Sequence, residues 1–424
     1  MANQVTTLKM GQKFKKTPVG DIPVDWDARN IRSLAEKMLN GGTPGTSIEK
    51  YWTGDIPWIT GADFVNQKIV TVRKRITREA VEHSATNVVP KGAVLVVTRT
   101  GVGKLAIAPC DVAISQDITG ILPDAEVVHP EYMFWALNLY APQLKAAHQG
   151  TSINGILRGD LEDFIIPIPP LREQKKIAEI LASVDDVLQK TQSVIDKVRG
   201  IKRALAQRLL TKRAGSANGS GLTGWPFVPL GELLEEPIKN GYSPTCPSDS
   251  TGMWTLELGA LSYGGFRPDR VKVAPQDDAK CAGAMLRPGD LLVSRSNTRE
   301  LVGLAAIYEG NPKNCIYPDL MMRVRVSPTE MNPYFLVLYL VSSYGRRFFE
   351  SEARGTSGSM LKINGEILSR MPVPKPPMKQ QAEICARIQA VQDLIRREEI
   401  GHQKYASAKD ALMRVLLSGR MRVS

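Results

Sequence analysis

Three stretches of the sequence come close to catalytic motifs, and each lacks a residue that its chemistry requires. "TGVGK" at residues 100–104 resembles part of a phosphate-binding loop, but that loop needs glycine at position 98 and serine or threonine at 105, where the chain has Thr98 and Leu105. "NPYF", from Asn332, has one proline, whereas a loop that holds an adenine amino group for methylation has two. "LPDAEVV" and "YPDLMMRV" lack the acidic-x-Lys sequence that completes a nuclease site. The residues therefore predict no catalytic centre in this chain.

Bulk composition narrows the class of protein further. The four histidines have no metal-ligand spacing, and the five cysteines are scattered without a C-x-x-C pair, which predicts a reducing, cytoplasmic location and neither a zinc site nor a disulfide framework. No run of about 18 apolar residues is present, and the N-terminus has no signal-peptide core. The net charge of +12 favours a polyanionic partner, either nucleic acid or an anionic membrane surface. Since the chain has no basic amphipathic helix, nucleic acid is the better expectation.

The elements that would position any site occur twice along the chain. "PKGAVLVVTR" from Pro90 pairs with "RPGDLLVSRS" from Arg287, and "VGKLAIA" pairs with "VGLAAIY". "GTSINGIL" from Gly150 and "GTSGSMLKINGEIL" from Gly355 each precede a proline-rich break and a long run without proline. Trp26 and Trp225 mark comparable starts. This ordered series indicates an old internal duplication.

Each copy consists of a mixed globule followed by a long helix. The Pro/Gly turns before "AVLVVT" and "LLVSRS" predict strands, and "PEYMFWALNLYAPQLKAAH" and "PYFLVLYLVSSYGRRFFES" predict helices that begin at proline. We expect an α+β protein with two tandem mixed α/β domains, two long helices and an internal pseudo-twofold repeat. The predicted boundaries are a tail at 1–21, a domain at 22–170, a helix at 171–213, a flexible linker at 214–222, a domain at 223–376, a helix at 377–418 and a tail at 419–424.

Both long helices carry apolar residues at alternating spacings of four and three, the heptad pattern of a coiled coil. The seams are Ile177, Leu181, Val184, Leu188, Ile195 and Val198 in the first helix and Ile384, Ile388, Val391, Ile395, Leu412 and Leu416 in the second. Glu398, His402 and Lys409 interrupt the second seam, which costs stability unless they fix register or meet another chain. About 40 residues make a helix roughly 60 Å long. One globule cannot cover that length, so we expect the helices to pair with each other and not only with their own globules.

Two globules on a helical spacer suit the reading of two sites on duplex DNA. At this point the sequence resembles the specificity subunits of type I restriction–modification systems, through "KKTPVGDIPVDW", "GGTP", "IPWIT", the Pro/Gly turns and the "GTSINGIL" break, all in duplicated order. The resemblance implies that each globule is a target recognition domain for one half of a bipartite, asymmetric DNA sequence. It implies that the helices form an antiparallel coiled coil that sets spacing and docks two methyltransferase (modification) subunits. It also implies no catalysis or cofactor in this chain, with S-adenosylmethionine, ATP and Mg²⁺ on the modification and restriction subunits.

The candidate DNA-binding residues lie at matching places in both copies. They are Lys68, Arg73, Lys74, Arg75, Arg99 and Lys104 in the first copy and Tyr263, Arg267, Lys272, Arg295, Asn297 and Arg299 in the second. The basic residues either contact phosphates or belong to solvated surface strands. Arg99 and Arg295 either fork onto guanine or pair with an internal carboxylate. The glycine-rich loop before Lys104 either lies against a phosphate or is simply a turn.

Two other functions stay open on the residues alone. One is an enzyme of the same system fused into this chain, which would need a restriction or methylation motif. The other is a non-catalytic scaffold whose two globules bind protein. Salt dependence distinguishes a scaffold from a DNA reader, because neutralising about 6–10 phosphates makes affinity fall roughly 10³–10⁵-fold between 50 and 200 mM salt. The bases recognised and the spacer length are not encoded in any spacing rule.

Overall fold

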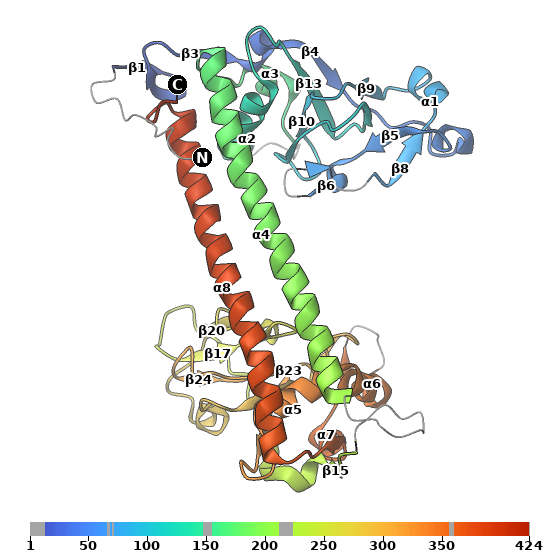
Figure 1. Ribbon diagram of the computed structural model, residues 1–424, viewed down its shortest axis with the longest axis vertical. Helices are drawn as coiled ribbons and strands as arrows, with labels where there is room; N and C mark the ends of the chain where they lie inside the picture. Colours follow the sequence, from blue (N-terminus) through green and yellow to red (C-terminus); the bar gives the residue numbers. More distant parts are fainter. Residues whose placement is uncertain are drawn as a thin grey trace. The chain divides into compact units, whose positions relative to one another are not determined.

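The computed structural model describes residues 13–65, 68–69, 72–146, 155–211, 224–355 and 360–423 (Figure 1). The predicted linker 214–222, most of the predicted N-terminal tail and the residues Gly150–Asn154 lie outside this part of the chain. The chain forms two compact units. Unit 1 comprises Met1–Gln192 and Ile400–Ser424, and unit 2 comprises Ser193–Glu399.

Unit 1 is built on two four-stranded sheets. The first is antiparallel, with the order β11 (Leu105–Ile107), β10 (Val94–Val97), β13 (Ile118–Pro123) and β4 (Ala35–Asn40). The second has the order β8 (Lys74–Ile76), β5 (Ile56–Ile59), β12 (Val112–Ile114) and β9 (Asn87–Val89), and β5 runs parallel to β12. Smaller pairs are β1 (Phe14–Thr17) with β2 (Gly20–Pro23), β3 (Asp27–Asn30) with β14 (Ile165–Ile168), and β6 (Phe64–Val65) with β7 (Lys68–Ile69). Its shorter helices are α1 (Arg78–Glu82), α2 (Pro130–Ala146), α3 (Arg158–Asp163), η1 (Ile31–Leu34), η2 (Glu49–Trp52) and η3 (Gly61–Asp63).

Unit 2 repeats the antiparallel sheet of unit 1 in the same strand order and has a three-stranded version of the second sheet. Its antiparallel sheet has the order β16 (Leu234–Asn240), β25 (Met321–Val326), β21 (Leu291–Ser294) and β23 (Ala305–Ile307). Its second sheet is β20 (Val271–Val273), β17 (Trp254–Leu256) and β24 (Cys315–Ile316), again with one parallel pair, β17 and β24. The small pairs are β15 (Phe227–Pro229) with β27 (Pro372–Pro374), β18 (Leu261–Ser262) with β19 (Gly265–Phe266), and β22 (Ser296–Asn297) with β26 (Leu361–Lys362). The helices are α5 (Pro333–Leu340), α6 (Ser343–Glu352), α7 (Gly365–Ser369), η4 (Leu230–Leu233), η5 (Leu258–Ala260) and η6 (Ala279–Ala284). The predicted α+β fold and internal repeat are thus confirmed.

The predicted turns account for the central strands. Gly92 and Gly289 have φ of 89° and 94°, a region that glycine enters without cost, and each follows the predicted proline. The strands that follow, β10 and β21, are buried along their whole length. The prediction of one helix from Pro333 to Ser351 is wrong, because Ser342 accepts hydrogen bonds from the backbone N–H groups of Tyr344 and Gly345 and so caps a second helix.

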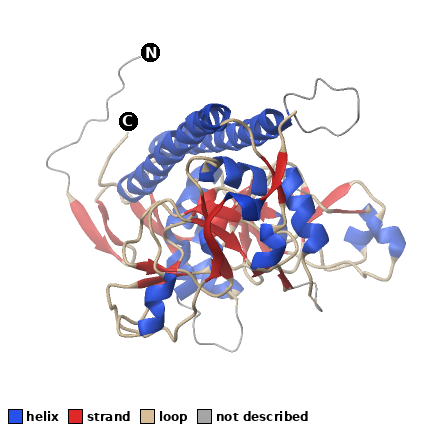
Figure 2. Ribbon diagram, turned by 90° about the horizontal axis from the view of Figure 1, so that it is seen from below, coloured by secondary structure: helices blue, strands red, loops and turns tan. Residues whose placement is uncertain are grey.

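The two long helices, α4 (Leu171–Thr211) and α8 (Met378–Leu417), lie side by side in both views (Figure 1, Figure 2). Within unit 1, Asp185 of α4 and Lys409 of α8 are 2.6 Å apart. Within unit 2, the side chain of Arg199 contacts that of Glu399 at 2.6 Å and Lys202 contacts Gln392 at 2.5 Å. In unit 2 rising numbers on α4 meet falling numbers on α8, so the pairing is antiparallel.

The apolar seam is buried to different degrees along these helices. The buried seam residues are Ile177, Leu181, Ile195, Ile384, Ile388, Ile395 and Leu416, and the half-buried ones are Val184, Leu188, Val198, Val391 and Leu412. Ile177, Leu181 and Leu416 belong to the core of unit 1, and Ile384 belongs to a core of unit 2. The helices therefore pack on their globules as well as on each other.

Candidate nucleic-acid interface

The edge strand β8 and the residue before it bring three predicted residues around one cavity. Arg73, Lys74 and Arg75 line a cavity of about 550 Å³ in unit 1, together with Trp52 and Gly54. Lys74 Nζ lies 4.8 Å from the centroid of the Trp52 ring, a cation–π contact. Lys68 lies in β7, but its side chain is outside the described part. The result is a basic cavity with one aromatic wall, a combination that suits a phosphate or the face of a base.

Both arginines, Arg73 and Arg75, are held in place by hydrogen bonds to neighbouring residues. Arg73 Nε lies 2.6 Å from Asp63 Oδ1 and its Nη2 donates to Thr60 Oγ1 at 3.0 Å. Burial raises the pKa of Asp63, but the hydrogen bonds from Arg73 and Thr60 outweigh burial and leave the pKa below its ordinary value. Arg75 Nη1 donates to the Asp55 carbonyl at 2.6 Å. Since the Asp63 carboxylate stays ionised and the Arg73 side chain is 54% exposed, Arg73 is held in place with its outer face available to a ligand.

The glycine-rich loop after β10 is a turn closed by its own lysine. Gly101 and Gly103 have φ of 87° and 82°. Lys104 Nζ donates to the carbonyl of Gly61 at 3.0 Å and approaches that of Phe64 at 3.5 Å. The ammonium therefore fastens the loop to η3 and β6, which accounts for Lys104 without a phosphate.

Arg99 and Arg295 differ although they follow equivalent strands. Arg99 is exposed, and among the described residues its side chain has no hydrogen-bond or ion-pair partner. Arg295 Nη1 donates to the Asp319 carbonyl at 3.2 Å, and its Nε is buried without a hydrogen-bond partner. Within the described ranges neither arginine pairs with a carboxylate, so that alternative for their role has no support. Arg99 is the better placed of the two to reach a ligand.

In unit 2 the predicted residues fall into two groups. Tyr263 Oη donates to the Glu300 carbonyl at 2.7 Å and so joins the β18–β19 hairpin to the loop that carries Asn297 and Arg299. The side chain of Asn297 is engaged within its own loop, because its Oδ1 accepts a hydrogen bond from the Thr298 N–H at 2.9 Å. The Arg299 side chain is exposed.

The other group lies beside β20, the counterpart of β8. Arg267 pairs with Asp269 at 3.1 Å between exposed side chains, and the exposed Lys272 approaches the half-buried Glu257 at 3.7 Å. Such pairs are worth about 0–1 kcal/mol, so a DNA phosphate could exchange with the carboxylates at little cost.

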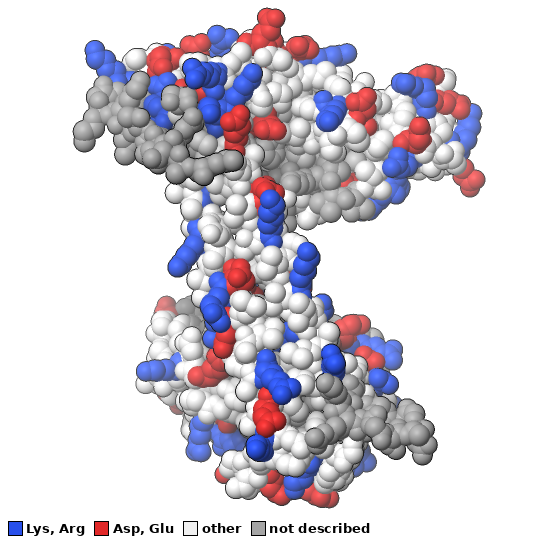
Figure 3. All heavy atoms as spheres, in the orientation of Figure 1, with Lys and Arg blue, Asp and Glu red and all other residues white. Residues whose placement is uncertain are grey.

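The structure adds residues that the sequence reasoning missed. Trp52 and Thr46 line the unit 1 cavity, and the aromatic-rich stretch "KYWTGDIPW", which runs into β5, was the available signal. Space-filling surfaces show Lys and Arg interspersed with Asp and Glu on the visible face, so the net positive charge is not gathered there in one patch (Figure 3). Among the described residues no group of three His, Cys, Asp or Glu side chains is arranged for a metal, and no helix is long and apolar enough to cross a membrane.

Comparisons with known proteins find similarity to one family. The type I restriction modification DNA specificity domain family matches residues 23–198. The MjaIX specificity subunit of Methanocaldococcus jannaschii is 33% identical over 194 residues, which are 44% of each chain. The MjaVIII specificity subunit of the same organism is 22% identical over 428 residues, which cover 97% of this chain and 96% of the relative. Residues 23–198 therefore match a type I specificity domain, and the relatives that align over nearly the whole chain are type I specificity subunits.

Solved structures extend the likeness to the whole fold. The type I restriction-modification S subunit from M. genitalium has a TM-score of 0.54 at 17% identity and covers 96% of this chain. A chain from a study of assembly and conformational transition in the type I system has a TM-score of 0.57 at 20% identity and covers 94%. The family match covers only the first copy, but the antiparallel sheet of the second copy has the same strand order. Both globules are therefore versions of one domain.

Proposed function

We propose that this chain is the specificity subunit of a type I restriction–modification system and reads a bipartite, asymmetric DNA target, one half with each globule. The observation that carries the proposal is the repeated strand frame with different loops upon it. Equivalent edge strands, β8 and β20, bring basic residues to the same place in each copy, while the loops after β10 and β21 differ in length and in charge. An unchanged frame holds the backbone of the duplex in the same way twice, and unequal loops give each copy its own base preference.

In this proposal α4 and α8 set the distance between the half-sites and dock two modification subunits. The chain itself performs no chemical step, and S-adenosylmethionine, ATP and Mg²⁺ belong to the modification and restriction subunits, in the cytoplasm. Charged pairs such as Arg199–Glu399, at 2.6 Å, support a fixed register of the helices, because a slip along the pair would separate them.

Methylation mapping tests the proposal directly. The chain is co-expressed with its modification subunit, and methylated adenines are mapped across the host genome. One two-part motif with a constant unspecified gap is the expected result. An assembled, active complex that methylates no such motif would refute half-site reading.

Binding measurements on single variants then locate the readers. Arg99→Ala should weaken specific binding by about 1–3 kcal/mol and relax the motif at one position of one half-site. Arg295→Ala should act less on base choice, because its Nη1 is held by the Asp319 carbonyl. Affinity that stays constant between 50 and 200 mM salt would instead favour a protein-binding scaffold.

A further inference from the structure

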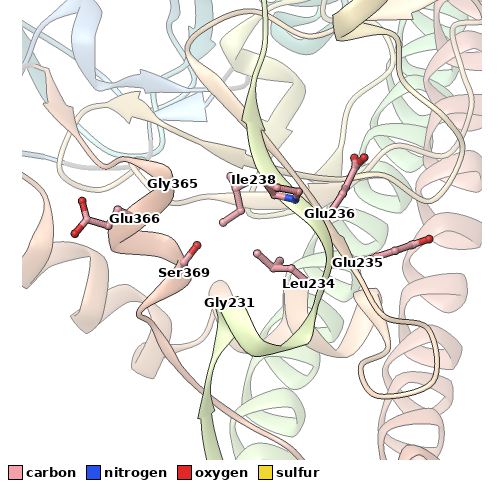
Figure 4. A pocket seen from close by; sticks show the side chains of 9 residues that line it. Gly231, Leu234, Glu235, Glu236, Ile238, Gly365, Glu366 and Ser369 are labelled. Carbon is pink, nitrogen blue, oxygen red and sulfur yellow. The ribbon is translucent and has the colours of Figure 1, made fainter.

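Unit 2 has a cavity of about 560 Å³ between α7 and β16 (Figure 4). Gly231 and Gly365 form part of its wall. The side chains of Leu234, Ile238 and Ser369 point toward the gap, while the carboxylates of Glu235 and Glu366 point away from it on opposite sides (Figure 4). The cavity therefore has an apolar floor, a hydroxyl and an acidic rim.

The internal repeat identifies what stands at this place in unit 1. Buried leucine and isoleucine residues fix the register between the two copies: Ile31 with Leu230, Leu34 with Leu233, and Leu161 with Leu368. In that register η1 corresponds to η4 and α3 corresponds to α7. Arg32 then corresponds to Gly231, Arg158 to Gly365, and Glu162 to Ser369.

In unit 1 these three positions form a closed ionic cluster. Arg158 Nε lies 2.6 Å from Glu162 Oε1, and Arg32 Nη2 lies 2.8 Å from Glu162 Oε2. Arg158 Nη2 also donates to the Met38 carbonyl of β4 at 3.3 Å. The arginines hold the pKa of Glu162 below its ordinary value, although slight burial opposes them. The guanidinium of Arg158 thus joins α3 to β4, and that of Arg32 joins η1 to α3.

In unit 2 both guanidinium groups are missing, but the groups that would receive one remain. Ile238 occupies the position of Met38 on the strand, and its carbonyl oxygen would lie 3.9 Å from a Cβ added at Gly365. Among the described residues the Ser369 hydroxyl has no hydrogen-bond partner, and Glu235 and Glu366 have no ion-pair partner. Glu236 is already occupied, because it accepts from Arg323 and Arg325 at 3.0 Å each.

We infer that this cavity receives an arginine side chain of a protein partner, and specifically of the modification subunit. The arginine stem would pack on Leu234 and Ile238, and its guanidinium would reach the Ile238 carbonyl and the Ser369 hydroxyl, while Glu235 and Glu366 at the edge of the cavity favour a cation over an anion there. DNA is disfavoured as occupant because the carboxylates repel phosphates. The modification subunit is favoured because α7 leads through β27 directly into α8, a helix proposed to dock it. The inference rests on that proposed function.

The test fills the cavity from within, using the residues of the first copy. Gly365→Arg with Ser369→Glu re-creates the pair formed by Arg158 and Glu162, and a Cβ at residue 365 meets only ordinary contacts, at 3.5 Å or more. A milder variant, Glu235→Gln with Glu366→Gln, removes the acidic rim without changing volume. Glu350→Gln, on the exposed surface of α6, is the matched control. Circular dichroism melts of the full-length chain confirm folding of each variant.

Binding of the purified modification subunit is measured by calorimetry with the full-length chain. The filled variant should lose at least about tenfold in affinity for one of the two modification subunits, the rim variant should lose about three- to tenfold, and the control should match the wild type. A filled variant that binds like the wild type would overturn the inference alone. A wild-type chain that binds no modification subunit would overturn the proposed docking and this inference together. A change in DNA affinity of the free chain, with unchanged subunit binding, would assign the cavity to DNA and overturn the inference as well.

Discussion

The end of the chain is tied into unit 1 through Arg422, and Arg422→Met should loosen the last turns of α8. Arg422 Nε lies 2.7 Å from Glu173 Oε1, Nη2 lies 2.7 Å from Asp25 Oδ2, and the guanidinium lies 5.6 Å from the Trp26 ring centroid. The Glu173 side chain is 7% exposed and that of Asp25 is 53% exposed. The bond to Glu173 therefore dominates, because the exposed pair is largely screened.

The size of the expected loss of stability depends on the hydrogen bonds that Glu173 keeps when Arg422 is replaced. Stranding one partner of a fully buried ion pair costs about 3–5 kcal/mol. Glu173 would retain the Trp26 indole N–H at 3.1 Å and the Val423 N–H at 3.3 Å as donors. We therefore expect a loss of about 2–3 kcal/mol, below the full figure. That corresponds to a roughly 30–140-fold increase in local opening.

Amide hydrogen exchange of the full-length chain measures this opening residue by residue. Protection at the C-terminal end of α8 should fall by that factor in Arg422→Met. Arg420→Met is the control, since Arg420 is exposed and has no partner among the described residues. The difference should persist at 0.5 M salt, because a largely buried pair is poorly screened. Equal protection in the two variants would show that the ion pair does not hold the chain end.

Four further variants test the frame of the two units. Gly41→Ala should lower the stability of the fold by about 3 kcal/mol or more, because its Cβ would lie 2.1 Å from the Ser115 carbonyl oxygen. In Gly159→Ala the new Cβ meets nothing within 4 Å, so this variant should be more stable by about 0.5–1 kcal/mol. Equal melting temperatures of the two variants would contradict this. Burial raises the pKa of Glu236, but the two neighbouring arginines outweigh burial and keep this pKa below its ordinary value of 4.5. The stability that ionised Glu236 contributes is therefore fully present above pH 4.5 and is lost as the pH falls through the lowered pKa. Glu236→Gln should thus be less stable than the wild type by about 3–5 kcal/mol at pH 7, and its stability should fall less on acidification. Urea titrations in which the stabilities of variant and wild type depend on pH in the same way would refute this. Gln381→Ala should cost about 2–4 kcal/mol, since it leaves buried backbone groups unpaired, and a stability within 0.5 kcal/mol of wild type would show that water replaces the amide.

The repeated frame was predictable because its causes are local and written twice. Proline and glycine before "AVLVVT" and "LLVSRS" fix the turns, and β-branched runs fix the buried strands that follow. The requirement for Gly41 was not predictable in detail. Its Cβ would collide with the backbone of residue 115, and Gly241 would collide with the Tyr317 carbonyl at 2.2 Å, both through contacts made by distant segments.

The candidate site was predictable in composition but not in geometry. The sequence places Lys104 in a glycine loop, where a phosphate contact is one reasonable interpretation. In the structure its ammonium is directed to the Gly61 carbonyl, in a segment some 40 residues earlier in the chain. Such a choice depends on which carbonyl the fold brings within 3 Å, and no spacing rule carries that information. Trp52 was missed for the same reason, because only the antiparallel pairing of β5 and β8 brings Lys74 over its ring.

Lys409, one of the three polar residues that interrupt the second helical seam, now has a physical explanation. Lys409 is 9% exposed, and its Nζ lies 2.6 Å from Asp185 on α4 and 4.6 Å from the centroid of the Trp135 ring. A buried lysine held by one carboxylate and one aromatic face is costly in any other register, because a shift of one turn would leave the ammonium unpaired. The polar position therefore trades stability for a single alignment of α8 within unit 1.

Each long helix carries a buried glutamine in its first turn that joins it to its own globule. Gln174 is fully buried, accepts from the His129 N–H and donates to the carbonyls of Val127 and Pro169. In unit 2, the equally buried Gln381 makes the same three bonds. It accepts from the Asn332 N–H and donates to the carbonyls of Glu330 and Pro376. An amide that satisfies three backbone groups can do so in only one orientation, so each helix leaves its own globule along a fixed direction. Duplication preserved this joint while the cavity beside α7 and the loops after β10 and β21 diverged, which is the pattern expected when the frame is common and the surfaces meet different partners.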